Sequence, residues 1–238
     1  MTRPPTILAT SGGFTRDARG NSVPAGLARL ALRLTGAERP KLCFVPTASG
    51  DAVGYVQMIY AAFAGWSVDV SHLSLFPMPN VDDLRKHVLE QDVVWVGGGS
   101  VAGLLAMWRL HGLDEVMREA WDAGVVLAGV SAGSICWHAG GTTDSFGPRL
   151  RPVTDGLGLL PYGNGVHYDS EAERRPMLHE LVAAGTLPTS YATDNGVGLL
   201  YQGTDLLGAY AETDGAYAYR VEAAGGHAVE TALSAERL

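Results

Sequence analysis

A serine lies at the centre of the glycine-rich segment Gly129-Val130-Ser131-Ala132-Gly133. The segment follows the apolar run 125–130 and precedes residues 134–138, which are compatible with a helix. G-x-S-x-G between a strand and a helix is typical of a nucleophile elbow, in which a tight turn raises the serine hydroxyl above the edge of a sheet. The sequence therefore predicts Ser131 as the nucleophile of a hydrolase. The alternative is a glycine-rich turn in which Ser131 only caps the helix.

A serine nucleophile needs a base within hydrogen-bond reach, and the chain has seven histidines. On a helix shared with Ser131, His138 would lie two turns away, at roughly 10 Å, which is too far. His167 follows the glycine-rich segment 162–166 and opens a loop that leads into an expected helix over 171–184. We therefore predict His167 as the base. The other histidines fall in expected surface helices, strands or a hairpin turn, namely His72, His87, His111, His179 and His227.

The group that orients the base has three candidates. Asp169 is two residues beyond His167, so on an extended segment the two side chains would point to one side. Asp194 and Asn195 follow an expected strand over 190–193. A carboxylate or an amide oxygen can accept the imidazole N–H, but only a carboxylate also stabilises the imidazolium. The residues alone leave all three candidates open.

The elements that position these residues alternate along the first 140 residues. Apolar runs separated by helix-period stretches predict successive βαβ units and a parallel sheet covered on both faces. The expected strands are 6–10, 41–46, 68–75, 92–96 and 125–130, and the expected helices are 25–34, 53–64, 81–89, 101–108 and 113–121, with Asn80 and Ser100 as N-caps. Short segments at 196–202, 206–210 and 216–221, separated by turn signals, predict antiparallel strands added to the sheet edge. We expect one α/β domain over residues 1–238.

Ligands of an open parallel sheet bind beyond the carboxyl ends of its strands. The segments that follow the expected strands are all small, polar or flexible: 11–13, 47–50, 97–100 and 129–133. Backbone amides can approach a substrate closely only where side chains are this small. The sequence therefore predicts a site at this edge.

The composition narrows the class of protein. With 47% hydrophobic and 18% charged residues the chain can bury a core, and its formal charge of −8 disfavours a nucleic-acid partner. No apolar run is long enough for a membrane span, so we expect a cytoplasmic protein without a membrane partner. Cys43 and Cys136 are expected to be reduced core residues. No His, Cys, Asp or Glu residues have the spacing of metal ligands. The glycines of 97–103 have a spacing one residue longer than that of the dinucleotide-binding fingerprint, so we expect no cofactor.

Four stretches together resemble the peptidase E (aspartyl dipeptidase) family and, more distantly, cyanophycinase: Gly97-Gly98-Gly99-Ser100, then Trp108, then 129–137, then 167–176. The similarity extends over nearly the whole chain. It implies a three-layer α/β/α fold with a mainly parallel central sheet, similar to class I glutamine amidotransferases, with serine in place of their cysteine.

The resemblance also implies roles for individual residues. Ser131 and His167 take the positions of nucleophile and base, and amides of Gly98, Gly99 and Ala132 those of the oxyanion hole. The acid of the family precedes a glycine after a late strand, and here the residue before Gly196 is Asn195, with Asp194 as the second candidate. The founding members have glutamate there, and relatives have aspartate or asparagine. Where this chain has Ser100, the founding members have asparagine. Both departures bear on activity and specificity.

Three functions follow as hypotheses. The first is a serine peptidase for short peptides, including dipeptides with an N-terminal aspartate, whose carboxylate would pair with Arg174 or Arg175; solvated helix charge is the equal alternative for these arginines. The second is another amide or ester hydrolase of cyanophycinase type. The third is a weakly active homologue that binds small molecules. A small peptide is the expected partner, and a homodimer is compatible with this interpretation.

Overall fold

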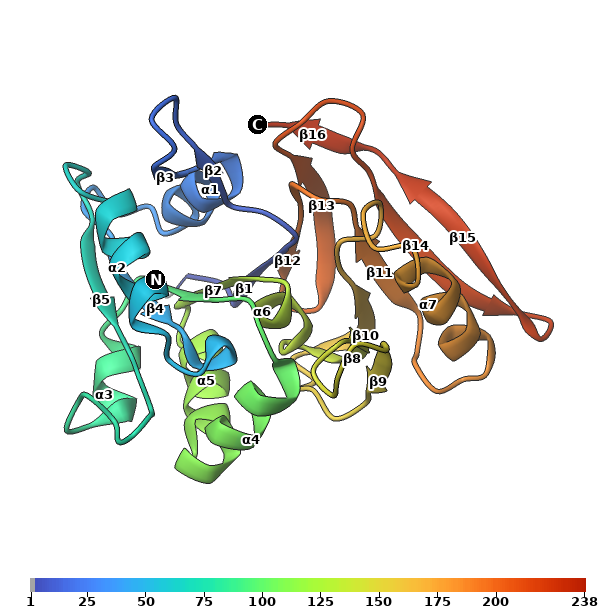
Figure 1. The fold of residues 1–238 in the computed structure, drawn as a ribbon, viewed down its shortest axis with the longest axis horizontal. Coiled ribbons are helices and arrows are strands. Elements are labelled where there is room, and N and C mark those ends of the chain that lie inside the picture. Colours follow the sequence, from blue (N-terminus) through green and yellow to red (C-terminus); the bar gives the residue numbers. More distant parts are fainter. Residues whose placement is uncertain (1–2) are drawn as a thin grey trace.

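The computed structural model describes residues 3–238 and contains a central eight-stranded sheet (Figure 1). Its strand order is β16-β13-β12-β1-β7-β6-β4-β5, and the five strands from β1 to β5 in this order run parallel. The bounds are β1 Thr6–Thr10, β4 Lys41–Val45, β5 Asp69–His72, β6 Val93–Val96, β7 Val126–Val130, β12 Val197–Gln202, β13 Asp205–Ala211 and β16 Ala235–Arg237. β12 pairs antiparallel with β1, and β13 with β12. The predicted parallel sheet and the antiparallel strands near the C-terminus are thereby confirmed.

Helices cover both faces of the central sheet, because alternate residues of each strand point to opposite sides. Leu8 and Phe44 pack with α1 and α2, whereas Ile7 and Cys43 belong to the core under α3, α4 and α5. Figure 1 shows these two helical layers above and below the sheet. The bounds are α1 Gly26–Leu34, α2 Val53–Ala62, α3 Leu84–Leu89, α4 Val101–His111 and α5 Leu113–Asp122. The three-layer α/β/α prediction is therefore confirmed.

A second sheet lies beside the first and was not predicted. Its order is β15-β14-β11-β10-β8-β9, with β8 His138–Thr143, β9 Arg151–Val153, β10 Leu160–Gly165, β11 Ser190–Thr193, β14 Ala218–Ala224 and β15 His227–Leu233. The segment around 216–221 thus belongs to this sheet, and its expected place at the edge of the central sheet is wrong. Glycines such as Gly140 and Gly163 weaken the strand signal of these segments. Each of these glycines lies so close to the neighbouring strand that no room is left for a Cβ atom.

Several helix boundaries differ from the sequence prediction. The helix after Ser131 is only α6, Ala132–Ile135, and His138 begins β8 instead of continuing it. α3 starts at Leu84, because Asp83 caps it by accepting from the Lys86 amide at 2.9 Å. Asn80 is no cap, since its amide oxygen accepts from Ser74 N. The last helix, α7, spans Arg174–Ala183, and a small hairpin joins β2, Phe14–Arg16, to β3, Ser22–Pro24.

Two smaller findings complete the fold. Both cysteines are free and buried, as predicted, and burial raises the pKa of the Cys43 thiol to about 12. Within residues 3–238, no helix combines the length and the apolar character needed to cross a membrane.

Candidate active site

Ser131 lies in the sharp turn between β7 and α6 with φ 57° and ψ −113°. A residue with a Cβ atom adopts positive φ only under strain, which is the conformation expected of a nucleophile elbow. The two flanking glycines are sterically required. A Cβ at Gly129 would lie 2.3 Å from the carbonyl oxygen of Gly133, and one at Gly133 would lie 2.3 Å from that of Val96. The turn therefore depends on both glycines of the motif.

The glycine loop after β6 faces the serine. A Cβ at Gly98 would lie 3.4 Å from Ser131 Cβ, at van der Waals contact, so this glycine lies directly beside the serine. Gly99 has φ 137° and approaches the carbonyl oxygen of Ala48 too closely for any side chain. Within residues 3–238, the amides of Gly99 and Ala132 have no hydrogen-bond acceptor. Backbone donors without a partner beside a nucleophile can stabilise an oxyanion.

Two further residues border this loop. Ser100 is the N-cap of α4, as predicted, and its hydroxyl accepts from Gly103 N at 3.0 Å. The sequence did not single out Tyr55, whose ring lies against Gly97. Burial raises the pKa of Tyr55, and the Gly98 amide partly opposes this shift. The Tyr55 hydroxyl therefore stays neutral at physiological pH beside the glycine loop.

His167 follows β10 and also has positive φ, 53°. Its amide donates to Ser11 Oγ at 3.2 Å, and this hydroxyl is 2.7 Å from Thr193 Oγ1. Next to Ser11, the carbonyl oxygen of Thr10 accepts from Ser131 N at 3.0 Å. The end of β1 thus holds the backbones of Ser131 and His167 next to each other. In the part of the chain that the structure describes, no hydrogen bond joins the Ser131 hydroxyl to the imidazole, and such bonds often form only with substrate.

The imidazole of His167 bonds to an amide side chain. His167 Nδ1 is 2.6 Å from Asn195 Oδ1. Asn195 is fixed in turn, because its Nδ2 donates to Ser170 Oγ at 2.9 Å and its backbone N donates to Asp169 Oδ1 at 2.8 Å. An amide oxygen only accepts, so Nδ1 must carry a proton. In the neutral imidazole, Nε2 is then left as the proton acceptor that a base requires.

The two carboxylates considered for this role lie elsewhere. Asp194 is buried and turned away, with Oδ2 accepting from Tyr217 N at 3.0 Å and from the Tyr219 hydroxyl at 3.2 Å. Burial raises the pKa of Asp194. Asp169 contacts the backbone of Asn195, as described above. Across residues 3–238, neither carboxylate forms a hydrogen bond with His167. Of the three candidates, the structure brings only Asn195 to the imidazole.

The two arginines expected to meet a substrate carboxylate are engaged within the fold. Arg174 is buried, forms an ion pair with Glu171 at 2.7 Å and donates to the carbonyl oxygen of Thr142 at 2.6 Å. Arg175 stacks between the rings of Tyr168 and Tyr219 and pairs with Glu230 at 2.6 Å. These internal contacts argue against the substrate role, because each guanidinium would have to leave its partners to bind a ligand.

His138, the histidine nearest to Ser131 in sequence, is also structural. It is buried against Tyr201, and its Nδ1 donates to the carbonyl oxygen of Ser134 at 2.9 Å. Burial lowers the pKa of His138 to about 4, so it is neutral at physiological pH. Its position in β8, rather than two turns along a helix, is what separates it from the elbow.

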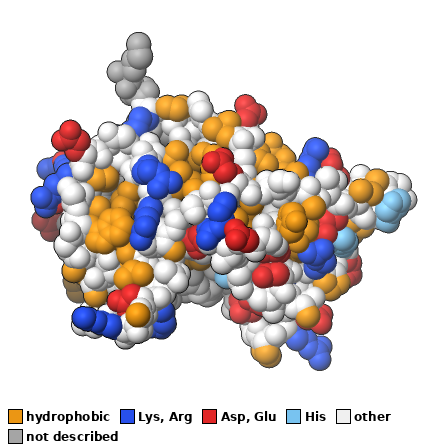
Figure 2. Space-filling model, turned by 90° about the horizontal axis from the view of Figure 1, so that it is seen from above, with side chains coloured by type: hydrophobic (Ala, Val, Ile, Leu, Met, Phe, Trp, Pro, Cys, Tyr) orange, Lys and Arg blue, Asp and Glu red, His pale blue; other side chains and the backbone are white. Residues whose placement is uncertain are grey.

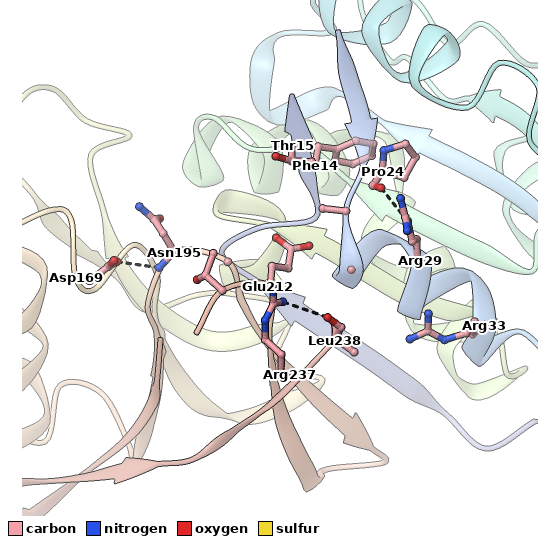
Figure 3. A pocket seen from close by; sticks show the side chains of 14 residues that line it. Phe14, Thr15, Pro24, Arg29, Arg33, Asp169, Asn195, Glu212, Arg237 and Leu238 are labelled. Atoms are coloured by element: carbon pink, nitrogen blue, oxygen red, sulfur yellow. Dashed lines mark hydrogen bonds between the residues drawn. The ribbon is translucent and has the colours of Figure 1, made fainter. Parts of the chain in front are cut away.

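A cavity of about 610 Å³ opens beside Asn195 and Asp169 (Figure 3). Arg29 and Arg33 project from α1 on one side of it, and Glu212 lies between them and Asn195. Glu212 accepts from Leu27 N at 2.8 Å and Gly13 N at 3.2 Å, and burial raises its pKa. The sequence analysis did not single out these residues. Arg29 and Arg33 occupy neighbouring turns of an expected helix, but no short motif connects them to Asn195.

The side chains that fix His167 and Asn195 were missed for the same reason. Ser11, Thr193 and Ser170 come from three separate parts of the chain, and a lone serine or threonine carries no recognisable spacing. The one available signal was the position of Ser11 in the first small-residue segment after a strand.

Comparison with known proteins shows the family to which the chain belongs. The model of peptidase family S51 matches residues 7–207. The chain is 42% identical over 90% of both chains to an uncharacterized peptidase, YgaJ, of Bacillus subtilis (strain 168). It is 28% identical to peptidase E of Shewanella denitrificans over 70% of this chain and 73% of that protein. The crystal structure of a peptidase from an acI-B1 Actinobacterium has the same fold, with a TM-score of 0.70 over 98% of this chain and 95% of that chain, at 17% identity.

The resemblance to peptidase E drawn from the sequence is thus confirmed. The strained serine between β7 and α6, with the glycine loop beside it, is the arrangement that a serine hydrolase requires. Because the family model covers most of the chain, the protein belongs to peptidase family S51 and is a serine peptidase.

Proposed function

We propose that this serine peptidase hydrolyses short peptides with Ser131 as nucleophile, His167 as base and Asn195 as the residue that orients the base. The observation that carries the proposal is the 2.6 Å contact between His167 Nδ1 and Asn195 Oδ1, beside a serine in the elbow conformation. It leaves His167 Nε2 unprotonated in the neutral ring, ready to accept the proton of the Ser131 hydroxyl.

The reaction follows from these positions. As Ser131 Oγ attacks the carbonyl carbon of the scissile bond, its proton passes to His167 Nε2, and the amides of Gly98, Gly99 and Ala132 receive the charge on the carbonyl oxygen. His167 then donates the proton to the leaving amine, and the peptide C–N bond breaks. A water molecule, activated by the same nitrogen, hydrolyses the acyl ester and restores Ser131.

The uncharged side chain of Asn195 lowers the rate that we expect for this reaction. It holds the imidazole in the right tautomer but offers no charge to the imidazolium formed during acylation. Exchanging a triad carboxylate for an amide in another serine protease costs about 10⁴ in rate. We therefore expect weak activity on ordinary Asp-X dipeptides, which are the substrates that the resemblance to the peptidase E (aspartyl dipeptidase) family implies.

A labelling assay and a substrate panel test the proposal together. Stoichiometric reaction of a fluorophosphonate with the wild-type protein, and none with Ser131→Ala, is expected for an activated serine. The panel should contain Asp-X dipeptides, neutral dipeptides and β-aspartyl-arginine dipeptides. Hydrolysis of the β-aspartyl members alone would favour a cyanophycinase-type enzyme. Absence of labelling in the folded protein would favour a small-molecule-binding homologue, for which the uncharged Asn195 is the supporting observation.

The cellular location and the partners of the enzyme are part of the same proposal. We propose a cytoplasmic enzyme that acts on small peptides without a membrane partner, alone or as a homodimer. The net charge of −8 disfavours a nucleic-acid partner. Sedimentation analysis of the purified protein tests its oligomeric state.

A further inference from the structure

The reacting residues of the proposed mechanism come from two different sheets. Ser131 follows β7 of the central sheet, whereas His167 follows β10 of the second sheet. The distance between the Ser131 hydroxyl and the imidazole therefore depends on how the two sheets are joined. Figure 1 shows α6, which continues the chain from Ser131, between β7 and the strands of the second sheet.

A pair of buried polar side chains joins α6 to the second sheet. Ser134 Oγ donates to Asn164 Oδ1 at 2.9 Å, and neither residue is exposed to solvent. Asn164 Nδ2 donates in turn to the carbonyl oxygen of Tyr191 in β11 at 3.1 Å. Among residues 3–238, no other hydrogen bond joins α6 to β10 or β11. The amide of Asn164 thus connects α6 to both strands that lead to His167 and Asn195.

The donors and acceptors of this pair fit together in one arrangement. A carbonyl oxygen only accepts, so the part of the Asn164 side chain that faces Tyr191 must be its NH2 group. Asn164 Oδ1 then faces Ser134, whose hydroxyl must donate. Turning the amide over would place two oxygen atoms against each other at Tyr191. The pair therefore holds α6 and β10 in a single relative position.

Packing alone does not require polar side chains at these two positions. Polar groups are ordinary on the surface, where Figure 2 shows charged side chains of both signs mixed over one face. In the interior, the desolvation of a hydroxyl and an amide offsets most of what their hydrogen bonds contribute. The sequence neighbours Ile135 and Val166 are buried and apolar. A hydrogen bond also weakens steeply with distance and angle, so the polar pair adds a directional constraint that apolar contacts lack.

Short stretches of chain connect this pair to the reacting groups. Ser134 N donates to the carbonyl oxygen of Ser131 at 2.8 Å, so the residue that holds Asn164 also closes the turn of the elbow. On the other side, Asn164 stands three residues before His167. A shift of α6 against β10 would therefore change the distance between nucleophile and base.

We propose that Ser134 and Asn164 are positioning residues that set the distance between the Ser131 hydroxyl and His167 Nε2. This inference rests on the proposed roles of Ser131 and His167, and it adds two residues that lie beneath the reacting atoms. Loss of the pair allows α6 to shift against β10, while the contact between His167 and Asn195 stays in place. The rate of attack by Ser131 should therefore fall without a change in the pH dependence of the reaction.

The rate constant of fluorophosphonate labelling tests the pair, because this reaction needs the Ser131 hydroxyl and its base but no peptide substrate. Ser134→Ala should lower the rate constant about tenfold, since a misplacement of about 1 Å can cost about 10² in rate. The midpoint of its pH profile should stay that of the wild-type protein. Asn164→Ala should cause at least the same loss, and the double variant should be no slower than Asn164→Ala, because either change breaks the same contact.

Ser190→Ala is the matched control for these variants. It removes a serine hydroxyl that is equally buried, from the same second sheet, but that donates only to the carbonyl oxygen of Pro188. The labelling rate of this variant should be that of the wild-type protein. Chemical denaturation of every variant checks that it is folded under the conditions of the assay.

A crystal structure of Ser134→Ala gives a second measurement, which does not depend on activity. We expect the distance between Ser131 Oγ and His167 Nε2 to exceed that of the wild-type protein by about 0.5 Å or more. An unchanged distance, or a wild-type labelling rate in folded Ser134→Ala, would overturn the inference. Losses that multiply in the double variant would also overturn it, as would an equal loss in Ser190→Ala, which would indicate a general loosening of the second sheet.

Two other variants separate this inference from the proposed function. Labelling that survives Ser131→Ala or His167→Ala would refute the proposed catalytic roles. The crystal structure of Ser134→Ala would then still decide whether the pair holds these two residues in place. Conversely, labelling that is lost in Ser131→Ala and His167→Ala but retained in Ser134→Ala would leave the catalytic roles standing and remove only the positioning role.

Discussion

The two halves of the candidate active site are built in different ways. The elbow half consists of residues 129–133 and the glycine loop, and it is fixed by close backbone contacts. A Cβ added at Gly129, Gly133 or Gly99 would collide with a carbonyl oxygen. The base half joins His167 after β10 to Asn195 after β11, and these two residues are held by hydrogen bonds that they donate to Ser11, Asp169 and Ser170.

This difference has a consequence for how each half can vary. A steric fit tolerates almost no substitution, because the backbone must move to relieve a clash. A hydrogen-bonded side chain can be exchanged for another of similar shape while its neighbours stay in place. The base half is therefore where rate and substrate can change while the elbow is retained. We propose that Asn195, at the position where the resemblance implies an acid, is such a change.

We expect the largest effect on activity from variants that remove the reacting group of either half of the site. Ser131→Ala and His167→Ala should each reduce kcat by about 10⁴ or more, and the double variant should be little worse, because nucleophile and base act as a unit. Steady-state kinetics with circular dichroism of each variant checks this. Additive losses would show that Ser131 and His167 act independently, and full activity in a folded Ser131→Ala protein would refute the nucleophile assignment.

The elbow half should respond strongly to added volume. Gly133→Ala places a methyl group 2.3 Å from the carbonyl oxygen of Val96, so we expect the free energy of unfolding to fall by about 3 kcal/mol together with loss of activity. Gly54→Ala, in α2 with open space around it, is the control and should stabilise the protein by about 0.5–1 kcal/mol. Chemical denaturation measures both. A stable and active Gly133→Ala variant would contradict the steric argument.

His138, next to the elbow helix, should make stability depend on pH. Its pKa is about 4 in the folded protein, against about 6.5 unfolded, so below pH 6.5 the unfolded state binds an extra proton. The stabilisation is complete above pH 6.5, and about 3 kcal/mol of it is lost as the pH falls to about 4. His138→Gln should remove this slope when unfolding is measured between pH 4 and 7. Identical slopes in the two proteins would show that His138 is not the group responsible.

The base half should respond to charge. Asn195→Asp supplies the carboxylate that the imidazolium lacks, and we expect kcat to rise about tenfold, well below the factor of about 10⁴ seen for this exchange elsewhere, because Asn195 is exposed. Asn195→Ala should lower kcat. Kinetics of Asp194→Ala and Asp169→Ala sharpen the assignment. If Asp194→Ala lowered kcat more than Asn195→Ala without lowering stability, the residue that orients His167 would be Asp194 instead of Asn195.

The smallest expected effect comes from the residue that positions Asn195. Ser170→Ala removes the acceptor of Asn195 Nδ2, so kcat should fall about fivefold with little change in KM, in keeping with about 1 kcal/mol for one hydrogen bond. In an Asn195→Ala background the same change should have no further effect. An undiminished loss there would mean that Ser170 acts on another group.

The sequence by itself determined the central sheet and the elbow. The apolar runs of β1, β4, β6 and β7 and the spacing of Gly129, Ser131 and Gly133 are local patterns, and the fold uses them where they stand. The same is true of Ser100, whose hydroxyl caps the helix that follows it. Such features are predictable because the physical requirement and the residues that meet it lie within a few positions of each other.

Only the tertiary structure decided how the base half is completed. The choice of Asn195 over Asp194 and Asp169 depends on the turn after β11, and the engagement of Arg174 and Arg175 depends on partners from β8, β14 and β15. Arg33 and Asn195 line the same cavity only because α1 packs beside the β12–β13 pair. These contacts join residues far apart in the chain through strands with many glycines and mixed polarity, so no local periodicity records which side chains will meet.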